Sequence, residues 1–392
     1  MRLTYVIPYF APAWGYGGPP RLTFDLARQL ARAGHAVHVL TTDALDGSSR
    51  ARPSFETMAG ITVQRLPNVS NRLAWEYKLF FPRGFRSALQ AALATSDMVH
   101  LFDFRDYQNA VALPFLERSG VPFVLSALGE LPRATGPKRP IKYVYDLLVG
   151  YRLLRRAAAL LAQTPEEAEW YARLGGRADR IHVLPLAVAL DSLPVATAPG
   201  TFRRKHGLEA SHRVVLFLGR IHEYKGLDVL LRAFAKMRRH RDEVRLVIAG
   251  RDDGYLDTAD RMAAELTPPG SVIFSGPVYG DDRFAAYRDA DLFAITPSHA
   301  EQTSLAALEA AACGTPVLTT VHAPIPGLDA AGAGLTVAYD VAAVHEAMVK
   351  LLDADSASAG ARAACLVRER FSLTSVSQQL ETLYRQAMSA PK

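Results

Sequence analysis

The chain has 392 residues, more than one hydrophobic core usually serves, so its length predicts two domains. Apolar residues make up 49% of it, which is ordinary for a soluble globular protein, and no apolar run approaches the roughly 20 residues of a membrane-spanning helix. The net charge of +6 favours acidic partners such as phosphates or anionic lipid, whereas scattered basic residues and the lack of a zinc-finger or RNA-binding signature argue against nucleic acid.

In chain order, short β-branched runs alternate with helical periodicity, which predicts parallel sheets with crossover helices. The apolar start meets Pro8 and Pro12 and therefore predicts a buried strand, not a signal peptide. The first helix is expected to begin at Pro20. The strands expected in the first half lie at 3–10, 35–42, 98–103, 122–127, 159–164 and 181–186.

Residues 189–200 are rich in Pro, Ala, Ser and Thr and lack periodicity, so we expect the linker there. The α/β pattern then restarts, which predicts two Rossmann-like domains, 1–188 and 201–371, with a cleft between them. The final segment, 372–392, is a helix that is a candidate to return to the first domain. The strands expected in the second half lie near 213–219, 244–250, 271–276, 292–297 and 316–320.

A double glycine, Gly17-Gly18, lies between the first strand and the first helix. Glycine lets a backbone approach a ligand closely, and a helix N-terminus attracts anions. The spacing is not that of a dinucleotide fingerprint, and Asp43 is the nearest acidic residue to the position expected for NAD. We expect a loop that faces a ligand, with a plain tight turn as the alternative, and we expect no organic cofactor.

Two cations follow one strand of the second half. Leu216-Phe217-Leu218-Gly219 ends the strand, Arg220 follows, and Lys225 precedes the next helix near Gly226. In such folds ligands bind beyond the carboxyl ends of the strands. A charge pair at about 4 Å is worth roughly 4 kcal/mol at an effective dielectric near 20, so these cations can stabilise a departing diphosphate without a metal. The alternative is two solvated surface charges.

Glu301 and Glu309 stand eight positions apart. Along a helix this is about 12 Å, which is too far to share one metal ion and suits two rings of one extended ligand. Thr303, Ser304 and Leu305 are expected in the helix's first turn, where free N–H groups bind phosphate. Together with the cations, these residues suit a nucleotide sugar. The alternative is a solvated Glu301 and a Glu309 on the helix surface.

These residues resemble the family 4 glycosyltransferases, which are retaining enzymes with the GT-B fold. The likeness covers nearly the whole chain and is strongest over 213–320, where spacing as well as residue type agrees. The motifs that carry it are the stretch from Phe217 to Gly226, Gly250, Phe274-Ser275-Gly276, Pro297-Ser298 with Glu301, and Glu309-Ala310 through Gly314-Thr315-Pro316-Val317.

The resemblance implies a role for each of these residues. Arg220 and Lys225 would hold the donor diphosphate, and Glu301 the transferred sugar, which makes these three the catalytic candidates. The residues that would bind the rest of the donor are Glu309 on the ribose hydroxyls, Ser304 and Leu305 on phosphate, the segment from Gly276 to Val278 facing the base, Gly219 at the strand end, and Gly17 and Gly18 from the first domain.

The first domain departs from the family pattern. The family's active-site histidine, often in Ser-x-His-Gly, is replaced here by Leu128 in Ser126-Ala127-Leu128-Gly129. Leu128 can neither donate a hydrogen bond nor relay a proton. His100 is a candidate substitute or a satisfied core histidine, and Asp103 and Glu130 are the other polar residues at strand ends of this domain.

Two stretches, 72–86 and 138–156, interleave aromatic and apolar residues with Arg and Lys, as in Trp75 and Phe80 of the first. This pattern suits an anionic membrane surface, and core packing with snorkelling cations is the alternative. We expect peripheral contact of the first domain with the inner face of a membrane.

We therefore predict a cytoplasmic, metal-independent retaining glycosyltransferase that moves a sugar from a nucleotide-sugar donor to a glycan or lipid-linked acceptor. Two cysteines are too few for a disulfide framework and favour a reducing compartment. No Asp-x-Asp pair stands at a predicted strand end. Two alternatives stay open: a sugar-nucleotide 2-epimerase of the same architecture, and a degenerate sugar-nucleotide-binding or scaffold subunit.

Overall fold

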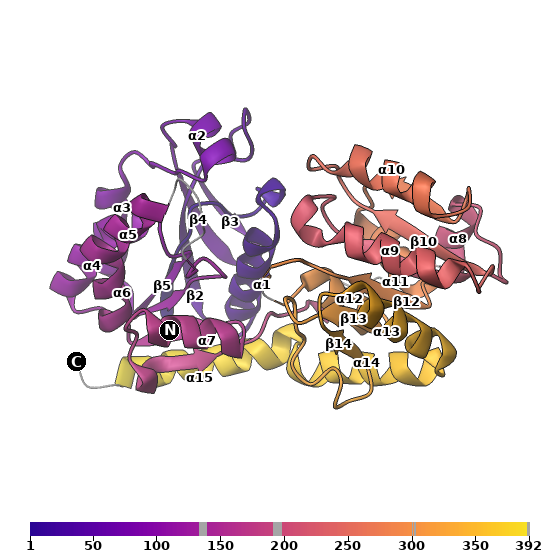
Figure 1. Ribbon diagram of the computed structural model, residues 1–392. Coiled ribbons are helices and arrows are strands. Elements are labelled where there is room, and N and C mark those ends of the chain that lie inside the picture. Colours follow the sequence, from indigo (N-terminus) through magenta and orange to yellow (C-terminus); the bar gives the residue numbers. More distant parts are fainter. Residues whose placement is uncertain (133–138, 191–197, 300, 302, 390–392) are drawn as a thin grey trace. The chain divides into compact units, whose positions relative to one another are not determined.

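The computed structural model describes residues 1–132, 139–190, 198–299, 301 and 303–389. The chain forms two compact units, one of Met1–Ala187 with Leu373–Lys392 and the other of Val188–Ser372. Each unit has its own largely parallel sheet with helices against it (Figure 1). The predicted class, two Rossmann-like α/β domains, is thereby confirmed. Most of the expected linker, 191–197, lies outside the described residues.

The first unit holds an eight-stranded sheet in which all neighbouring strands are parallel except the first pair. All six strands expected in the first half are present, although the first ends at Val6. In the order in which they pair, the strands are β3 (Phe55–Met58), β4 (Ile61–Leu66), β2 (Ala36–Thr42), β1 (Arg2–Val6), β5 (Met98–Phe102), β6 (Phe123–Ser126), β7 (Ala159–Ala162) and β8 (Ile181–Val183).

The antiparallel hairpin β3–β4 is absent from the sequence prediction. A tight turn through Ala59 and Gly60, both at positive φ, replaces the crossover helix that the alternating pattern leads one to expect. β4 also carries a buried cation, because Arg65 is 2% exposed and pairs with Glu56 of β3 at 2.7 Å. A charge in a strand interior hides the apolar pattern of that strand.

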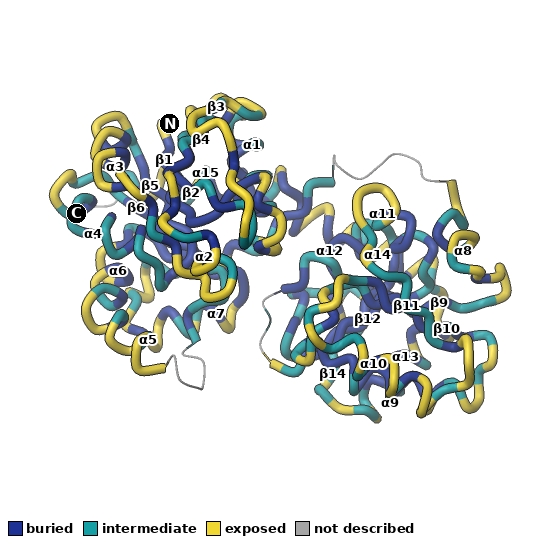
Figure 2. Tube along the Cα trace, turned by 90° about the horizontal axis from the view of Figure 1, so that it is seen from above, coloured by how far each residue is buried: buried dark blue, intermediate teal, exposed yellow. Residues whose placement is uncertain are grey.

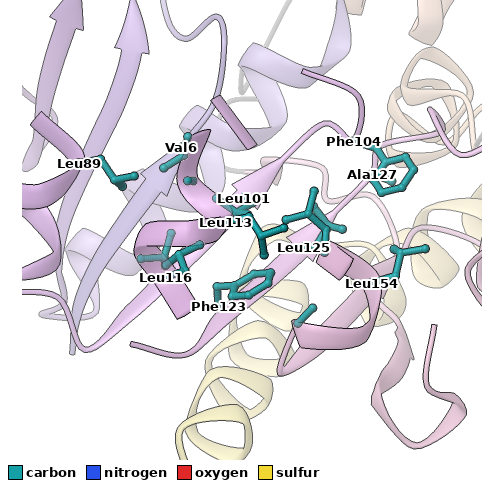
Figure 3. Close-up of a cluster of buried hydrophobic side chains, with 14 of the residues drawn as sticks. Val6, Leu89, Leu101, Phe104, Leu113, Leu116, Phe123, Leu125, Ala127 and Leu154 are labelled. Atoms are coloured by element: carbon teal, nitrogen blue, oxygen red, sulfur yellow. The ribbon is translucent and has the colours of Figure 1, made fainter. Parts of the chain in front are cut away.

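Helices surround this sheet, and the core lies between them. Figure 3 shows Val6, Leu101 and Leu125 from neighbouring strands in one buried cluster with Leu113 and Leu154 from helices. The helices of the unit are α1 (Gly18–Arg32), α2 (Asn71–Tyr77), α3 (Phe85–Leu93), α4 (Tyr107–Ser119), α5 (Arg139–Tyr145), the π-helical turn η2 (Asp146–Gly150), α6 (Tyr151–Arg156), α7 (Pro165–Arg173) and α15 (Leu373–Ser389).

The last helix, α15, is tied to the first unit by a buried polar chain. The Tyr384 hydroxyl lies 2.6 Å from Nδ1 of His100 and 3.0 Å from the Tyr5 hydroxyl, and Nε2 of His100 lies 2.8 Å from the Ser126 hydroxyl. His100 is 1% exposed, and both ring nitrogens have partners. It is therefore a satisfied core histidine and not a substitute for the family's active-site histidine.

We expect His100 to make the protein lose stability in mild acid. Burial lowers the pKa of His100 from 6.5 to about 3, so the folded chain keeps a neutral ring that the unfolded chain protonates. The contribution of His100 to the free energy of unfolding is therefore complete above about pH 6.5 and decreases as the pH falls toward 3. Between pH 7 and pH 5 the decrease is about 2 kcal/mol. Urea unfolding at stepped pH measures this slope.

The free energy of unfolding of the wild type, measured relative to that of His100→Gln, should fall by about 2 kcal/mol between pH 7 and pH 5. This difference isolates His100 from Asp103 and Asp106, whose raised pKa values act in the opposite direction and are common to both proteins. The same change at the exposed His240 should give no such difference. Equal slopes in the wild type and in His100→Gln would show that other groups govern acid stability.

The second unit holds a six-stranded, fully parallel sheet. In pairing order its strands are β11 (Val272–Gly276), β10 (Val244–Ala249), β9 (Arg213–Leu218), β12 (Leu292–Ile295), β13 (Val317–Thr320) and β14 (Gly334–Val337). Its helices are α8 (Thr201–Lys205), the 3₁₀ turn η5 (Glu223–Lys225), α9 (Leu227–Arg238), α10 (Leu256–Leu266), α11 (Gly280–Asp289), α12 (Leu305–Ala312), α13 (Val341–Asp353) and α14 (Ser356–Arg370).

The edge strand β14 was also not predicted, because its glycine resembles loop sequence. Gly334 is required by the pairing with β13, since a Cβ there would lie 2.0 Å from the carbonyl oxygen of Val317. The other five strands of this sheet fall within a few residues of their predicted positions.

The segment 72–86 is packed differently from what its aromatic residues suggest. Phe80 is 3% exposed and lies in a small core cluster with Tyr9 and Tyr16, against which Trp75 also packs. The expectation that Phe80 faces a membrane is therefore wrong, because its ring is buried inside the unit. Trp75 is half-buried against the same cluster, whereas Leu73, Tyr77 and Leu79 of this segment are exposed. Within the described residues, no helix combines the length and the apolar character needed to cross a membrane.

Candidate active site

Arg220 lies two residues beyond β9, at the carboxyl end of the second unit's sheet. Its guanidinium donates to the Asp253 carboxylate at 2.6 Å and to the Tyr224 hydroxyl at 2.8 Å. Half of the side chain stays exposed. Two partners fix the orientation of this cation while one side remains open to solvent, which is the arrangement expected of a group that receives an anionic ligand.

Lys225 belongs to the 3₁₀ turn η5 and is only 6% exposed. Its ammonium pairs with the Glu301 carboxylate through Oε1 and lies 4.8 Å from the centroid of the Tyr224 ring. The second carboxylate oxygen of Glu301 is buried and has no hydrogen-bond partner in the described part of the chain. A buried acceptor without a donor is costly, so a ligand hydroxyl that donated to it would relieve that cost.

The backbone around Lys225 is held close to β12. Gly226 has φ 68°, and a Cβ there would lie 1.7 Å from the carbonyl oxygen of Thr296, so only glycine fits. The Thr296 hydroxyl donates to the Gly226 carbonyl at 2.9 Å, and the Ser298 N–H donates to the Tyr224 carbonyl at 2.8 Å. These contacts bring η5 and the segment that leads to Glu301 together, although 76 residues separate Lys225 from Glu301.

The two carboxylates flank the start of α12 and do not share one helix. Glu301 precedes α12, whereas Glu309 lies within it, so the helical span of about 12 Å does not describe their separation. Glu309 is 6% exposed; its Oε2 accepts from the Tyr287 hydroxyl at 3.1 Å, and its Oε1 lies 3.2 Å from the Arg283 guanidinium. Glu309 is thus a buried, partnered carboxylate and not a solvated one on the helix surface.

The first turn of α12 begins two residues later than expected. Leu305 is its first residue, and Ser304 caps it by accepting from the Ala307 N–H at 3.4 Å. Thr303 lies outside the helix, where its hydroxyl donates to the Pro324 carbonyl at 3.1 Å. The Ser304 cap satisfies the third N–H of the helix and leaves the earlier ones, beginning with that of Leu305, for another acceptor.

Two further predicted residues lie on the same sheet's loops. Gly219 directly follows β9, and a Cβ on Gly250 would lie 1.7 Å from its carbonyl oxygen, so the loops after β9 and β10 approach closely. Val278 is half-buried between β11 and α11. Gly219, Arg220, Lys225, Val278, Glu301, Ser304, Leu305 and Glu309 all belong to the second unit.

Gly17 and Gly18 belong to the first unit and stand at the N-terminus of α1. Gly17 has φ 104°, which favours glycine, and both glycines are exposed, with no atom of the described residues within 4 Å of an added Cβ. The protein itself therefore does not fill the space beside this backbone.

Near the ends of β5 and β6 lie two residues with left-handed backbone and two acids whose pKa values are raised by burial. Asp103 and Leu128 both adopt left-handed φ, 63° and 51°. Asp103 is 4% exposed, and burial, with the nearby Glu130 and Asp106 carboxylates, raises its pKa well above the ordinary value. Burial likewise raises the pKa of Asp106 to about 8. Strained, buried acids of this kind concentrate at functional sites.

The loop that carries Leu128 is fixed by hydrogen bonds from its backbone to two side chains of α7. The Tyr171 hydroxyl accepts from the Ala127 N–H at 2.8 Å, and the Glu167 carboxylate accepts from the Gly129 N–H at 2.7 Å. Leu128 thus occupies a fixed position without a polar side chain.

Sequence reasoning missed the residues that orient the predicted site. Tyr224 and Asp253 hold Arg220, and Tyr287 and Arg283 hold Glu309. Tyr224 stands beside Lys225 in the sequence and was within reach of a local argument. Asp253 and Arg283 meet their partners only through the fold. No group of His, Cys, Asp and Glu among the described residues is arranged to hold a metal ion.

The fold is that of a two-domain α/β protein, and the cations Arg220 and Lys225 lie at the carboxyl edge of the second unit's sheet. The sequence family described as glycosyl transferase 4-like domain matches residues 17–187, and the one described as glycosyl transferases group 1 matches residues 200–364. A D-inositol 3-phosphate glycosyltransferase of Xylanimonas cellulosilytica is 31% identical, with 99% of this chain and 96% of that relative covered. The chain belongs to the family 4 glycosyltransferases and is a glycosyltransferase.

Solved structures agree on the GT-B fold. A sucrose-phosphate synthase from Thermosynechococcus elongatus superposes with a TM-score of 0.76 at 21% identity, with both chains covered in full. HepE from Anabaena, solved in complex with UDP and glucose, superposes with a TM-score of 0.74 at 18% identity over 98% of this chain and 100% of HepE.

Proposed function

We propose that this glycosyltransferase moves a sugar from a nucleotide-sugar donor to an acceptor with retention of anomeric configuration, and that it needs no metal ion. The observation that carries the proposal is the group of Arg220, Lys225 and Glu301 at one sheet edge. Two cations there are oriented by neighbours, and one buried carboxylate oxygen has no donor among the residues that the structure describes. Such a group matches a diphosphate next to a sugar hydroxyl.

In this proposal each residue acts on a different part of the donor. As the bond between the anomeric carbon and the diphosphate breaks, negative charge grows on the diphosphate, where Arg220 and Lys225 stabilise it. Glu301 holds the transferred sugar, and the N–H groups at the start of α12 hold phosphate. Glu309 binds the ribose, Val278 faces the base, and Gly219 lets the backbone approach.

The first unit supplies the remaining parts. Gly17 and Gly18 form the loop that approaches the donor. Leu128 stands where family members have histidine, so Asp103 and Glu130 are the polar side chains proposed to face the acceptor. Burial, with the nearby Glu130 and Asp106 carboxylates, raises the pKa of Asp103 well above its ordinary value, which favours the protonated form that can donate a hydrogen bond.

The proposed acceptor is a glycan or a lipid-linked sugar, and the proposed location is the cytoplasm, with peripheral contact at the inner face of a membrane. The relatives' name specifies D-inositol 3-phosphate, so an acceptor screen should include that compound. The similarity to D-inositol 3-phosphate glycosyltransferases supports transfer over epimerisation and over a scaffold role.

A thermal-shift screen of nucleotide sugars tests the donor assignment. A donor at 100 times its Kd stabilises the folded protein by about 2.7 kcal/mol, which is readily measured. The nucleoside diphosphate alone should stabilise as well, because the proposed contacts fall largely on that part. Failure of every uridine, guanosine and adenosine diphosphate sugar to raise the melting temperature would refute the assignment.

We expect activity to survive EDTA, because Arg220 and Lys225 already offer the charge that a metal would bring to the diphosphate. Initial rates with the best donor, measured before and after treatment with EDTA and gel filtration, provide the test. Complete loss of activity that Mg²⁺ or Mn²⁺ restores would overturn the metal-independent mechanism.

A further inference from the structure

The outer face of α5 and of the turn that follows it is apolar and exposed. Ile141 is 72% exposed, Val144 52%, Leu147 59% and Leu148 65%. Their spacing of three and four residues places them on one side of the helix. Figure 2 shows this segment as a largely exposed stretch at the edge of the first unit. Clustered large apolar side chains on a surface mark an interaction site.

The inner face of the same segment is firmly anchored. Asp146 is 1% exposed and pairs with Arg105 at 2.7 Å, and the Tyr145 hydroxyl donates to the Asp106 carbonyl at 3.0 Å. Leu153 and Leu154 of α6 are buried in the main core cluster. The exposed residues are therefore not the unpacked core side of a loose helix. They are the outward half of a helix whose inward half is satisfied.

The charged residues around this face are mainly basic. Residues 139–156 contain five basic residues and one acidic residue, and the acidic one is the buried Asp146. Arg139 and Arg155 are exposed, as are Arg152 and Arg156, which share Glu117 as a partner. Apolar residues with basic neighbours fit an anionic lipid surface, where the apolar groups enter the interface and the cations contact headgroups.

We propose that Ile141, Val144, Leu147 and Leu148, with the basic residues of 139–156, form the surface by which this protein docks onto an anionic membrane. The proposal assigns docking to the second of the two stretches expected to face membrane. In the first stretch, Phe80 is buried inside the unit and Trp75 is half-buried against the same cluster. Lys138 of that second stretch lies outside the described residues. The docking proposal depends only on this surface. The statement that the acceptor lies at the membrane depends in addition on the proposed function.

Sedimentation with phosphatidylglycerol–phosphatidylcholine vesicles tests the proposal in the full chain. The wild type should bind at low salt. Its affinity for the vesicles should fall by about fivefold for each contact between a basic side chain and a lipid phosphate that added salt screens. Ile141→Gln with Leu148→Gln should weaken binding by roughly tenfold or more, because both side chains lose their apolar burial. Phe55→Gln is the matched control, since Phe55 is 59% exposed in the same unit but outside the basic segment.

Two readouts separate the outcomes. The melting temperatures of the Gln variants should equal that of the wild type, because the changed side chains are exposed, and their shift with donor should be unchanged. Lack of vesicle binding by the wild type at low salt, or equal binding by the double variant, would overturn the docking surface. The docking surface would also be overturned if the wild type were a dimer and the double variant a monomer, since a second copy would then cover this face. Vesicle binding without any donor shift would instead refute the proposed function and leave docking in place.

Discussion

Lys225→Ala should lower kcat by roughly 100-fold while leaving the protein folded, by analogy with the loss of a group that stabilises transition-state charge. Lys225 is buried and its ammonium is held in place by the ion pair with Glu301, so the cation is already oriented when the diphosphate binds. Arg220→Ala should cause a comparable loss, because it removes the other cation of the pair. The measurement is kcat with the donor that gives the largest thermal shift.

Lys205→Ala is the matched control for the lysine. Lys205 also pairs with a carboxylate, Asp282 at 2.6 Å, but both side chains are half-exposed and neither is among the residues proposed to bind the donor. Its loss should leave kcat within about twofold, since exposed ion pairs contribute little. Lys225→Met, which keeps the apolar stem, separates loss of charge from loss of packing. Wild-type kcat in both Lys225→Ala and Arg220→Ala would remove the diphosphate role.

The sequence predicted most of the parallel strands of both sheets because each of those strands is a short apolar run followed by a helix. It failed where this pattern is absent. The β3–β4 hairpin has a two-residue turn in place of a helix and a buried Arg65 in its interior, and β14 contains a glycine required by the neighbouring strand. Each of these features is a tertiary requirement that a local pattern cannot express.

The same limit applies to the site. Arg220 and Lys225 were found because both follow one strand, and strand ends collect at one edge. The pairing of Lys225 with Glu301, which sets the burial of the cation, depends on η5 and β12 meeting in space. In the segments predicted to face membrane, composition alone could not separate inward from outward side chains. Phe80 is buried whereas Ile141 is exposed, although both lie in stretches of similar composition.

Glu309→Gln should weaken binding of the nucleoside diphosphate by roughly tenfold or more, because a hydrogen bond to a charged acceptor is worth about 1.5–3 kcal/mol. Glu301→Gln should leave that affinity within about twofold and lower kcat, because Glu301 is assigned to the sugar, which the free nucleotide lacks. Titration calorimetry with the nucleoside diphosphate, together with kcat for the full donor, measures both effects.

The competing explanation for Glu309 is structural, since it also holds Tyr287 and Arg283. Tyr287→Phe separates the two roles: it removes the hydroxyl that donates to Glu309 but keeps the carboxylate. That variant should lose stability, because its change is fully buried, yet keep nucleotide affinity within about threefold. If Tyr287→Phe weakened nucleotide binding as much as Glu309→Gln, Glu309 would act through packing and not on the ribose. If Glu301→Gln weakened it equally, the division of the donor between the two carboxylates would be wrong.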